Sequence, residues 1–269
     1  MFDQELALDH LTYTLDFIYG FIFLFGFLVV VAYVENFKKF NRIIFPLPDV
    51  VRKYLAQYYP FYKRLSFRRK RKFDLRMKRF LNSFDYELRG NMRFTPEVQA
   101  VLGGAATRIS LNLPEECFDF FNTIVLYPDF YHSHVTDKHH KGEVNPTRRT
   151  IVFSWKGIVE GFNRGEDGLN LLMHEYAHAL YFEHKLMHDE YEIFNDEAFN
   201  RVMGQAEIEI ERIKAGTNHF LRNYAATNVE EFFAVATENF FERSVQFKKE
   251  LPELYGTLVL LLRQDPAKD

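Results

Sequence analysis

The sequence of 269 residues predicts an α+β fold that is mostly helical, contains a small mixed β-sheet and is preceded by one transmembrane helix. Three observations indicate this fold class. Residues 17–34 carry no charge and are long enough, at about 1.5 Å per residue, to cross the bilayer core. Apolar residues recur at helical spacing in most later segments. Residues 124–127 and 150–155 instead form short runs of β-branched and aromatic residues, as strands do.

Residues 17–34 are interpreted as an uncleaved membrane anchor after a short non-cytoplasmic N-terminus at residues 1–16. A cleaved signal peptide needs a basic start, whereas this chain begins with Asp3 and Glu5 and has no small-residue cleavage site. A core helix is the other alternative. Lys and Arg occur only after the segment, which predicts a single-pass protein of the cytoplasmic (inner) membrane with its N-terminus outside. The folded part then lies in the cytoplasm, in agreement with the single cysteine, Cys117.

Charge is distributed unevenly after this anchor. Residues 35–93 contain 17 Lys and Arg against 5 Asp and Glu, whereas residues 94–269 contain 17 against 28. The densest basic run, Arg68–Lys72, fits either nucleic acid or anionic lipid headgroups, and its nearness to the anchor favours the membrane surface. No nucleic-acid partner is therefore expected. Residues 35–60 are interpreted as a juxtamembrane linker and residues 61–265 as the folded domain.

Helices and strands of the folded domain follow from capping residues and apolar spacing. Ser66 is expected to cap a first helix, and Asn170 precedes a strongly apolar helix-forming run. The remaining expected elements are a helix at 96–113, strands at 124–127 and 150–155, a helix at 198–216, a helix starting near Asn228 and a terminal helix at 258–262.

The run after Asn170 contains His174-Glu175-x-x-His178, the pattern H-E-x-x-H. Residues four apart lie on one face of a helix, so both imidazoles can point at one spot. Neutral imidazoles at that separation suit a zinc ion. Glu175 lies towards the open side of the metal, where it can take a proton from a bound water. Two chance histidines on an amphipathic helix are the alternative, and this pattern arises by accident in about one chain per hundred.

A catalytic zinc needs a third protein ligand, and two residues qualify. His184 has the metzincin spacing, but that pattern requires a glycine where this chain has Tyr181. Without the glycine the helix is expected to continue and to carry His184 away from the metal. Glu231 lies near the start of the later helix, among aromatic residues, where a carboxylate needs a partner. Glu231 is therefore favoured, with a capping role after Asn228 as its alternative.

Several motifs together resemble a known family over about residues 60–260. They are Leu126-Tyr127-Pro128-Asp129-Phe130, Val152-Phe153-Ser154-Trp155, the H-E-x-x-H pattern, and the run from Tyr224-Ala225-Ala226-Thr227-Asn228 through Glu231-Phe232-Phe233-Ala234-Val235. In these residues the chain resembles the Mlc titration factor A family of zinc-dependent peptidases.

The resemblance implies a zincin-like metallopeptidase domain of gluzincin type, similar around the metal to the catalytic domain of anthrax lethal factor. It implies that His174, His178 and Glu231 bind Zn²⁺, that Glu175 is the general base, and that Tyr224 stabilises the transition state.

Two departures from the family pattern bear on substrate range. The family commonly has Gln-Leu-Asp where this chain has Ala179-Leu180-Tyr181, and acidic residues near the position of His184. The resemblance also makes the strand at 150–155 a candidate edge strand that pairs with an extended substrate, with an interior strand as its alternative. Glu238, seven residues after Glu231, either orients a ligand histidine or is a surface carboxylate.

The sequence thus predicts a membrane-anchored zinc-dependent peptidase that acts on a peptide or protein substrate. The alternative is a regulatory binding partner that sequesters a transcriptional repressor, with secondary or vestigial peptidase activity. The histidines between His132 and His140 lack a common helical register and are interpreted as solvated or substrate-side groups rather than metal ligands.

Overall fold

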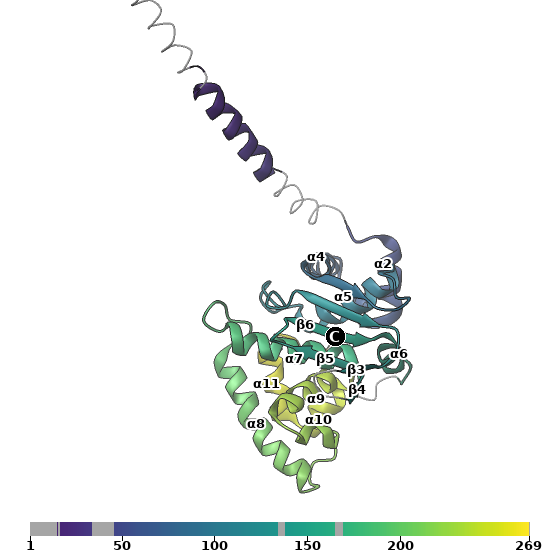
Figure 1. The fold of residues 1–269 in the computed structure, drawn as a ribbon. Helices are drawn as coiled ribbons and strands as arrows, with labels where there is room; N and C mark the ends of the chain where they lie inside the picture. The colour runs from purple at the N-terminus through teal and green to yellow at the C-terminus, as the bar shows by residue number, and fades with distance from the viewer. Residues whose placement is uncertain (1–14, 16, 34–45, 134–137, 165–168, 269) are drawn as a thin grey trace, which may run out of the picture. The chain divides into compact units, whose positions relative to one another are not determined.

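The computed structural model describes residues 15, 17–33, 46–133, 138–164 and 169–268. The chain divides into two compact units, Met1–Pro46 and Leu47–Asp269 (Figure 1). Within the first unit, residues 17–33 are helical and their side chains are exposed. The elements described below belong to the second unit.

The predicted transmembrane helix is not confirmed. Among the residues that the structure describes, no helix combines the length and the apolar character needed to span a membrane. Helical structure is described for residues 17–33, whereas residue 34 and residues 1–14 and 35–45 on either side lie outside the described part of the chain.

A four-stranded sheet has the order β1-β2-β6-β5. Its strands are β1 (Asp85–Leu88), β2 (Thr123–Tyr127), β5 (Gly142–Asn145) and β6 (Thr150–Ser154). The first three in spatial order are parallel, and β5 runs antiparallel to β6. The small mixed sheet predicted from the sequence is therefore confirmed.

The expectation that the strand at 150–155 lies at an edge is wrong. β6 has β2 on one side and β5 on the other, because residues 142–145 form a strand that the sequence analysis did not identify. The edge beside β6 is thus β5. A separate two-stranded sheet pairs β3 (Tyr131–Ser133) with β4 (Lys138–His140). The side chains of residues 132–140 lie outside the described part, so their solvation remains a prediction.

The helices confirm most of the predicted elements and their capping residues. The side chain of Ser66 accepts a hydrogen bond from the Arg69 amide, and the side chain of Asn170 accepts one from the Met173 amide. In chain order they are α2 (Asp49–Tyr58), α3 (Pro60–Arg64), α4 (Phe67–Ser83), α5 (Pro96–Ser110), α6 (Trp155–Arg164), α7 (Leu171–Met187), α8 (Asp196–Lys214), η1 (Asn223–Ala226), α9 (Val229–Glu242), α10 (Ser244–Glu250), α11 (Pro252–Leu262) and η2 (Pro266–Lys268).

The folded unit begins before residue 61, because residues 47–60 pack into its core. Leu47, Val51 and Leu55 are buried, and α2 packs against α5. The approach is close at Gly104, where an added Cβ would lie 2.2 Å from the ring of Tyr59. The segment that the sequence analysis assigned to the linker therefore supplies a helix of this unit.

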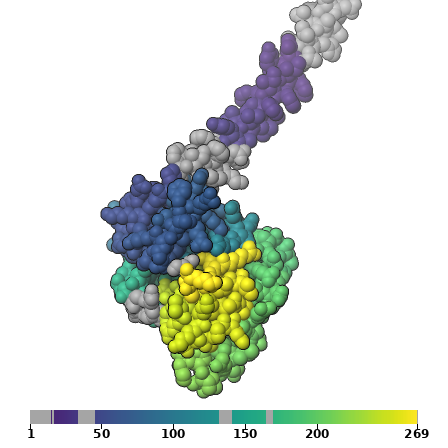
Figure 2. Space-filling view, turned by 180° about the vertical axis from the view of Figure 1, so that it is seen from behind, coloured from purple at the N-terminus to yellow at the C-terminus, as the bar shows by residue number. Residues whose placement is uncertain are grey.

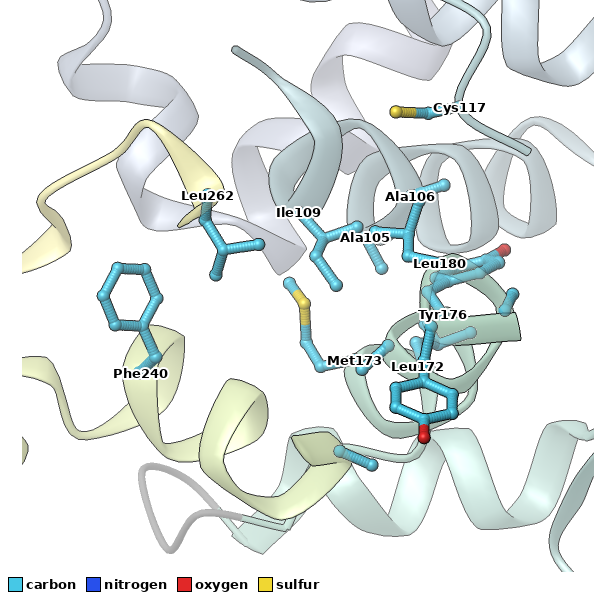
Figure 3. Packing of buried hydrophobic residues seen from close by; sticks show 14 of the residues in the cluster. Ala105, Ala106, Ile109, Cys117, Leu172, Met173, Tyr176, Leu180, Phe240 and Leu262 are labelled. Carbon is cyan, nitrogen blue, oxygen red and sulfur yellow. The ribbon is translucent and has the colours of Figure 1, made fainter. Parts of the chain in front are cut away.

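Helix α7 lies in the hydrophobic core, where it packs against α5, α9 and the strands β5 and β6. Figure 3 shows Met173 and Leu180 of α7 next to Ile109 and Ala106 of α5, while the ring of Tyr176 on α7 points away from these two residues of α5. These five side chains are nearly or fully buried. Burial on several sides holds α7, and with it the H-E-x-x-H motif, in one position.

The C-terminal residues also pack on this unit. The buried side chain of Gln264 donates hydrogen bonds to the backbone carbonyls of Arg108 and Ile109. Figure 2 shows the C-terminal residues, in yellow, on the surface beside the blue helices from the start of the unit. The C-terminal residues therefore pack against α5, although the two segments are far apart in the sequence.

Glu183 on α7 anchors the loop that precedes β2. Its carboxylate is fully buried and accepts hydrogen bonds from the Phe118 and Phe120 amides and from the Tyr191 hydroxyl. Burial raises the pKa of Glu183 from 4.5 to about 7, against the lowering effect of these donors. Burial likewise raises the pKa of the nearby Cys117 thiol to about 12, which fits a small buried residue rather than a nucleophile.

The pKa of Glu183 predicts a pH-dependent stability. Because the folded-state pKa is raised, the stabilising contribution of Glu183 is complete below pH 4.5 and is lost as the pH rises through 7. The loss amounts to about 3 kcal/mol of unfolding free energy. Urea unfolding of the wild type and Glu183→Gln across this pH range should show the wild-type advantage shrinking. A constant difference between the two proteins would contradict the assignment.

Candidate metal centre

Helix α7 brings the two histidines of the motif together. The run of Leu, Met, Ala and Glu residues favours a helix, and α7 continues without interruption from Leu171 to Met187. His174 and His178 lie one turn apart on it, and their Nε2 atoms are 3.1 Å apart. Both histidines are buried, so their imidazoles are held on the inner side of the helix.

The third candidate ligand atom comes from α9, which packs along α7. The Asn228 side chain accepts a hydrogen bond from the amide of Glu231 and so begins α9 with Glu231 in its first turn. Glu231 Oε2 lies 3.2 Å from His174 Nε2 and 3.3 Å from His178 Nε2. Of the capping box considered for Glu231, the hydrogen bond from the Glu231 amide to the Asn228 side chain is present. The Glu231 carboxylate lies next to the two histidines.

These three atoms fit a zinc ion. In a tetrahedral shell with bonds of about 2.0–2.1 Å, neighbouring ligand atoms are about 3.3–3.4 Å apart. The observed separations of 3.1, 3.2 and 3.3 Å match the edges of such a shell. The ligand set of two imidazoles and one carboxylate also suits zinc, and leaves a fourth position open.

His184 does not join this group. Helix α7 lacks a glycine at Tyr181 and continues past it, so His184 lies with His188 and Asp196 instead. Among the described residues, the groups of ligand atoms close enough for a metal are His174 with His178 and Glu231, and His184 with His188 and Asp196. We expected His184 to lie away from His174 and His178 because the chain has no glycine at position 181, and the structure agrees.

Glu238 on α9 orients His174. Its side chain is 1% exposed, and its Oε1 lies 2.6 Å from His174 Nδ1. Arg222 donates two hydrogen bonds to the same carboxylate, and the backbone amide of Asn170 donates a third. Of the two alternatives for Glu238, the structure therefore supports the orienting role and excludes a surface carboxylate.

The electrostatics of the group favour positive charge at His174, which has Glu231 beside its Nε2 and Glu238 beside its Nδ1. Burial works to lower the pKa of His174, but its contacts with Glu231 and Glu238 raise that pKa to about 10. Burial works to raise the pKa of Glu231, and the two histidines hold it well below its usual range. Two carboxylates therefore compete for positive charge at this point, as metal-binding residues do.

Glu175 lies against β5, which is the edge strand of the described sheet. Its carboxylate is buried, and burial raises its pKa above the usual value. An added Cβ at Gly142 would lie 2.5 Å from Glu175 Oε1, so only glycine leaves room for the carboxylate here. Glu175 thus follows His174 directly in the chain and lies against the first residue of β5.

Tyr224 lies beside the histidines. It belongs to η1, and its ring centroid is 6.0 Å from that of His174. Burial and the nearby Glu231 raise the pKa of Tyr224 above its usual value, so its hydroxyl keeps its proton at neutral pH. The side chain is half exposed and is therefore accessible to a substrate.

Comparison with known proteins identifies the family. The family model described as Glucose-regulated metallo-peptidase M90 matches residues 38–263. The chain belongs to this metallopeptidase family. The M90 assignment agrees with the resemblance seen in the sequence to the Mlc titration factor A family, which is thereby confirmed.

Two relatives of this M90 chain are similar over most of its length. It is 27% identical over 228 residues to the uncharacterized protein slr2042 of Synechocystis sp. (strain ATCC 27184 / PCC 6803 / Kazusa), which covers 79% of this chain and 83% of the relative. It is 27% identical over 210 residues to the Mlc titration factor A of Serratia proteamaculans (strain 568), which covers 64% and 71%.

Two hydrogen-bond donors to Glu238 in this M90 domain, Arg222 and the amide of Asn170, were not predicted from the sequence. Arg222 precedes Tyr224 by two residues, and this spacing was the sequence feature that could have indicated that Arg222 lies near the site. The amide of Asn170 was predicted to lie at the start of α7, but its contact with Glu238 depends on the packing of α7 against α9. Sequence spacing alone does not give that packing.

Proposed function

We propose that this protein is a zinc-dependent peptidase, with His174, His178 and Glu231 as metal ligands and Glu175 as general base. Membership of the M90 family supports a metallopeptidase. The observation that carries the proposal is the triangle of ligand atoms, with edges of 3.1–3.3 Å, next to the buried carboxylate of Glu175.

The chemistry follows from the positions of these side chains. His174, His178 and Glu231 would hold a zinc ion, which would supply a Lewis acid and lower the pKa of water to about 7. Glu175 takes the proton of the attacking water and returns it to the leaving amine. The Tyr224 hydroxyl donates a hydrogen bond to the oxyanion that develops on the substrate carbonyl. Glu238 holds His174 in its ligand orientation through Nδ1.

The edge strand β5 supplies a surface for an extended peptide. An open strand edge presents unpaired backbone groups, and a substrate adds to it by β-augmentation. Gly142 of β5 lies against Glu175, so a peptide bound along β5 passes close to the general base. This geometry supports a peptide or an extended segment of a protein as the substrate.

The substitution Gly142→Ala tests this arrangement. The new Cβ would lie within 2.7 Å of the Cγ, Cδ and Oε1 atoms of the buried Glu175. We therefore expect turnover to fall by about 10²-fold and the melting temperature to fall, while zinc binding changes little. Peptide cleavage, zinc content and thermal melting measure the three effects. Gly204→Ala is the matched control, because an added Cβ there meets no atom within 4 Å. Equal turnover in both variants would exclude a precise placement of Glu175 by β5.

The peptidase proposal has a direct functional test. Wild-type protein is stripped of metal with a chelator and assayed on a library of peptides before and after zinc is restored. We expect cleavage to disappear with the metal and to return with it. If zinc-loaded protein cleaves no peptide, or if cleavage survives complete removal of the metal, the proposal fails.

A second candidate function is regulation of a transcriptional repressor. It is favoured by the similarity to a relative whose name describes it as a titration factor of Mlc. On this account the protein binds a regulator and peptidase activity is secondary. A pull-down with Glu175→Gln distinguishes the two, because a partner captured by the variant and left intact by the wild type indicates binding without hydrolysis.

We also propose that residues 17–34 anchor the protein in the cytoplasmic (inner) membrane with the peptidase domain in the cytoplasm. The support is the uncharged sequence and the exposure of its apolar side chains, which no water-soluble helix tolerates on every face. The basic run at 68–72 then contacts anionic headgroups. Alkaline extraction of cell membranes is the test: release of the full chain into the soluble fraction would refute the anchor.

A further inference from the structure

A second cluster of metal-ligating side chains lies at the other end of α7. His184 lies in the last turn of α7, His188 follows directly as the C-capping residue of this helix, and Asp196 is the first residue of α8. Asp196 Oδ1 lies 3.6 Å from His184 Nε2 and 3.5 Å from His188 Nδ1. One ligand atom from each residue lies within 4.8 Å of the other two.

The fold holds the ring of His184 in a set orientation. Its side chain is 5% exposed, and its ring packs against Phe199, with 4.3 Å between the ring centroids, and against Phe194 at 5.4 Å. The Asn195 side chain caps α8 by accepting a hydrogen bond from the Ala198 amide. The cap places Asp196 in the first turn of α8, opposite His184, so this geometry does not depend on flexible side chains alone.

Hydrogen bonds do not account for this arrangement. The separations of 3.5 and 3.6 Å exceed the 2.7–3.2 Å of ordinary hydrogen bonds, and both imidazoles approach the same carboxylate oxygen. Two ligands of one metal ion, with bonds of about 2.0–2.2 Å, are separated by about 3–4 Å. The spacing therefore fits an ion between the three side chains better than direct pairing.

We propose that His184, His188 and Asp196 bind a second divalent transition-metal ion, separate from the centre at His174. Imidazole nitrogen selects zinc, cobalt or nickel over magnesium and calcium, which prefer oxygen ligands. The side chains of His188 and Asp196 are about half exposed, at 50% and 46%, so water completes the coordination shell. This proposal does not depend on peptidase activity.

The ion links the end of α7 to the start of α8. The segment between these helices contains Tyr191, which donates a hydrogen bond to Glu183, and Phe194, which is buried against Phe233 of α9. Helix α8 in turn packs against α9, which carries Glu231. Binding at this site stabilises the helix pair next to the first centre, and we expect it to raise the melting temperature.

The test is the number of zinc ions bound per full-length chain, measured by equilibrium dialysis with zinc. We expect two ions in the wild type and one in each of His188→Ala and Asp196→Asn. His219→Ala is the matched control, because His219 is exposed and lies outside both clusters, and it should bind two. His188 and Asp196 are surface residues, so circular dichroism should show native folding of these variants.

A further variant separates the two sites. Glu231→Ala should also bind one ion, and the double variant Glu231→Ala with His188→Ala should bind none. The second site is overturned if His188→Ala and Asp196→Asn bind as many ions as the wild type. If Glu231→Ala binds as many ions as the wild type, while His188→Ala and Asp196→Asn each bind one fewer, the first centre is wrong and the second site stands.

Discussion

The variant Glu175→Gln is expected to bind zinc as tightly as the wild type and to lose about 10²–10⁴-fold in turnover. The amide has nearly the same shape as the carboxylate but accepts no proton from water at neutral pH. Glu175 supplies none of the three atoms that form the ligand triangle, so its replacement leaves the triangle intact. The loss should appear in kcat rather than in metal affinity.

Peptide cleavage and zinc content measured on the same preparation check this result. Glu230→Gln is the matched control, because Glu230 is another acidic residue, in the first turn of α9, and lies outside the ligand group. Turnover by Glu175→Gln within a few fold of the wild type would contradict the role of Glu175 as general base. Loss of zinc would instead assign it a role in metal binding.

The variant Glu231→Ala is expected to weaken zinc binding at the first centre by more than about 100-fold. Replacing a residue that merely orients a ligand costs about 10–100-fold in affinity, and Glu231 supplies a ligand atom itself. Only the two imidazoles of α7 remain in this variant, and peptide cleavage should disappear with the metal.

Competition with a chelator of known affinity measures this loss, in a chain that also carries Asp196→Asn so that only the first centre contributes. In that background Glu230→Ala and His184→Ala should bind zinc as the parent does. Loss of zinc with His184→Ala but not with Glu231→Ala would show that His184 is the third ligand. That outcome requires α7 to unwind after His178, contrary to its continuous course to Met187.

The sequence predicted that His174, His178 and Glu231 lie together because each residue has a local signal. His174 and His178 have helical spacing, and Asn228 marks the start of the helix that carries Glu231. The absence of glycine at Tyr181 predicted correctly that α7 continues past that residue. Such signals depend on neighbouring residues only, and tertiary packing does not alter them.

Other features depend on contacts between distant segments, and the sequence did not reveal them. The edge strand β5 is short and contains Gly142 and Asn145, so it lacks the β-branched run that identified β6. Residues 47–60 appeared to be a linker because of Pro46 and Pro48, whereas their apolar residues pack against α5. Arg222 contacts Glu238 only after η1 and α9 fold together.

Zinc K-edge X-ray absorption tests most directly whether His174, His178 and Glu231 hold the metal. The full chain with Asp196→Asn is loaded with one zinc per chain and compared with the same chain carrying Glu231→Ala. We expect two imidazole nitrogens at about 2.0–2.1 Å together with carboxylate and water oxygens, and no such shell in the second protein. A shell that contains sulfur, lacks imidazole, or is unchanged by Glu231→Ala would contradict the proposed centre.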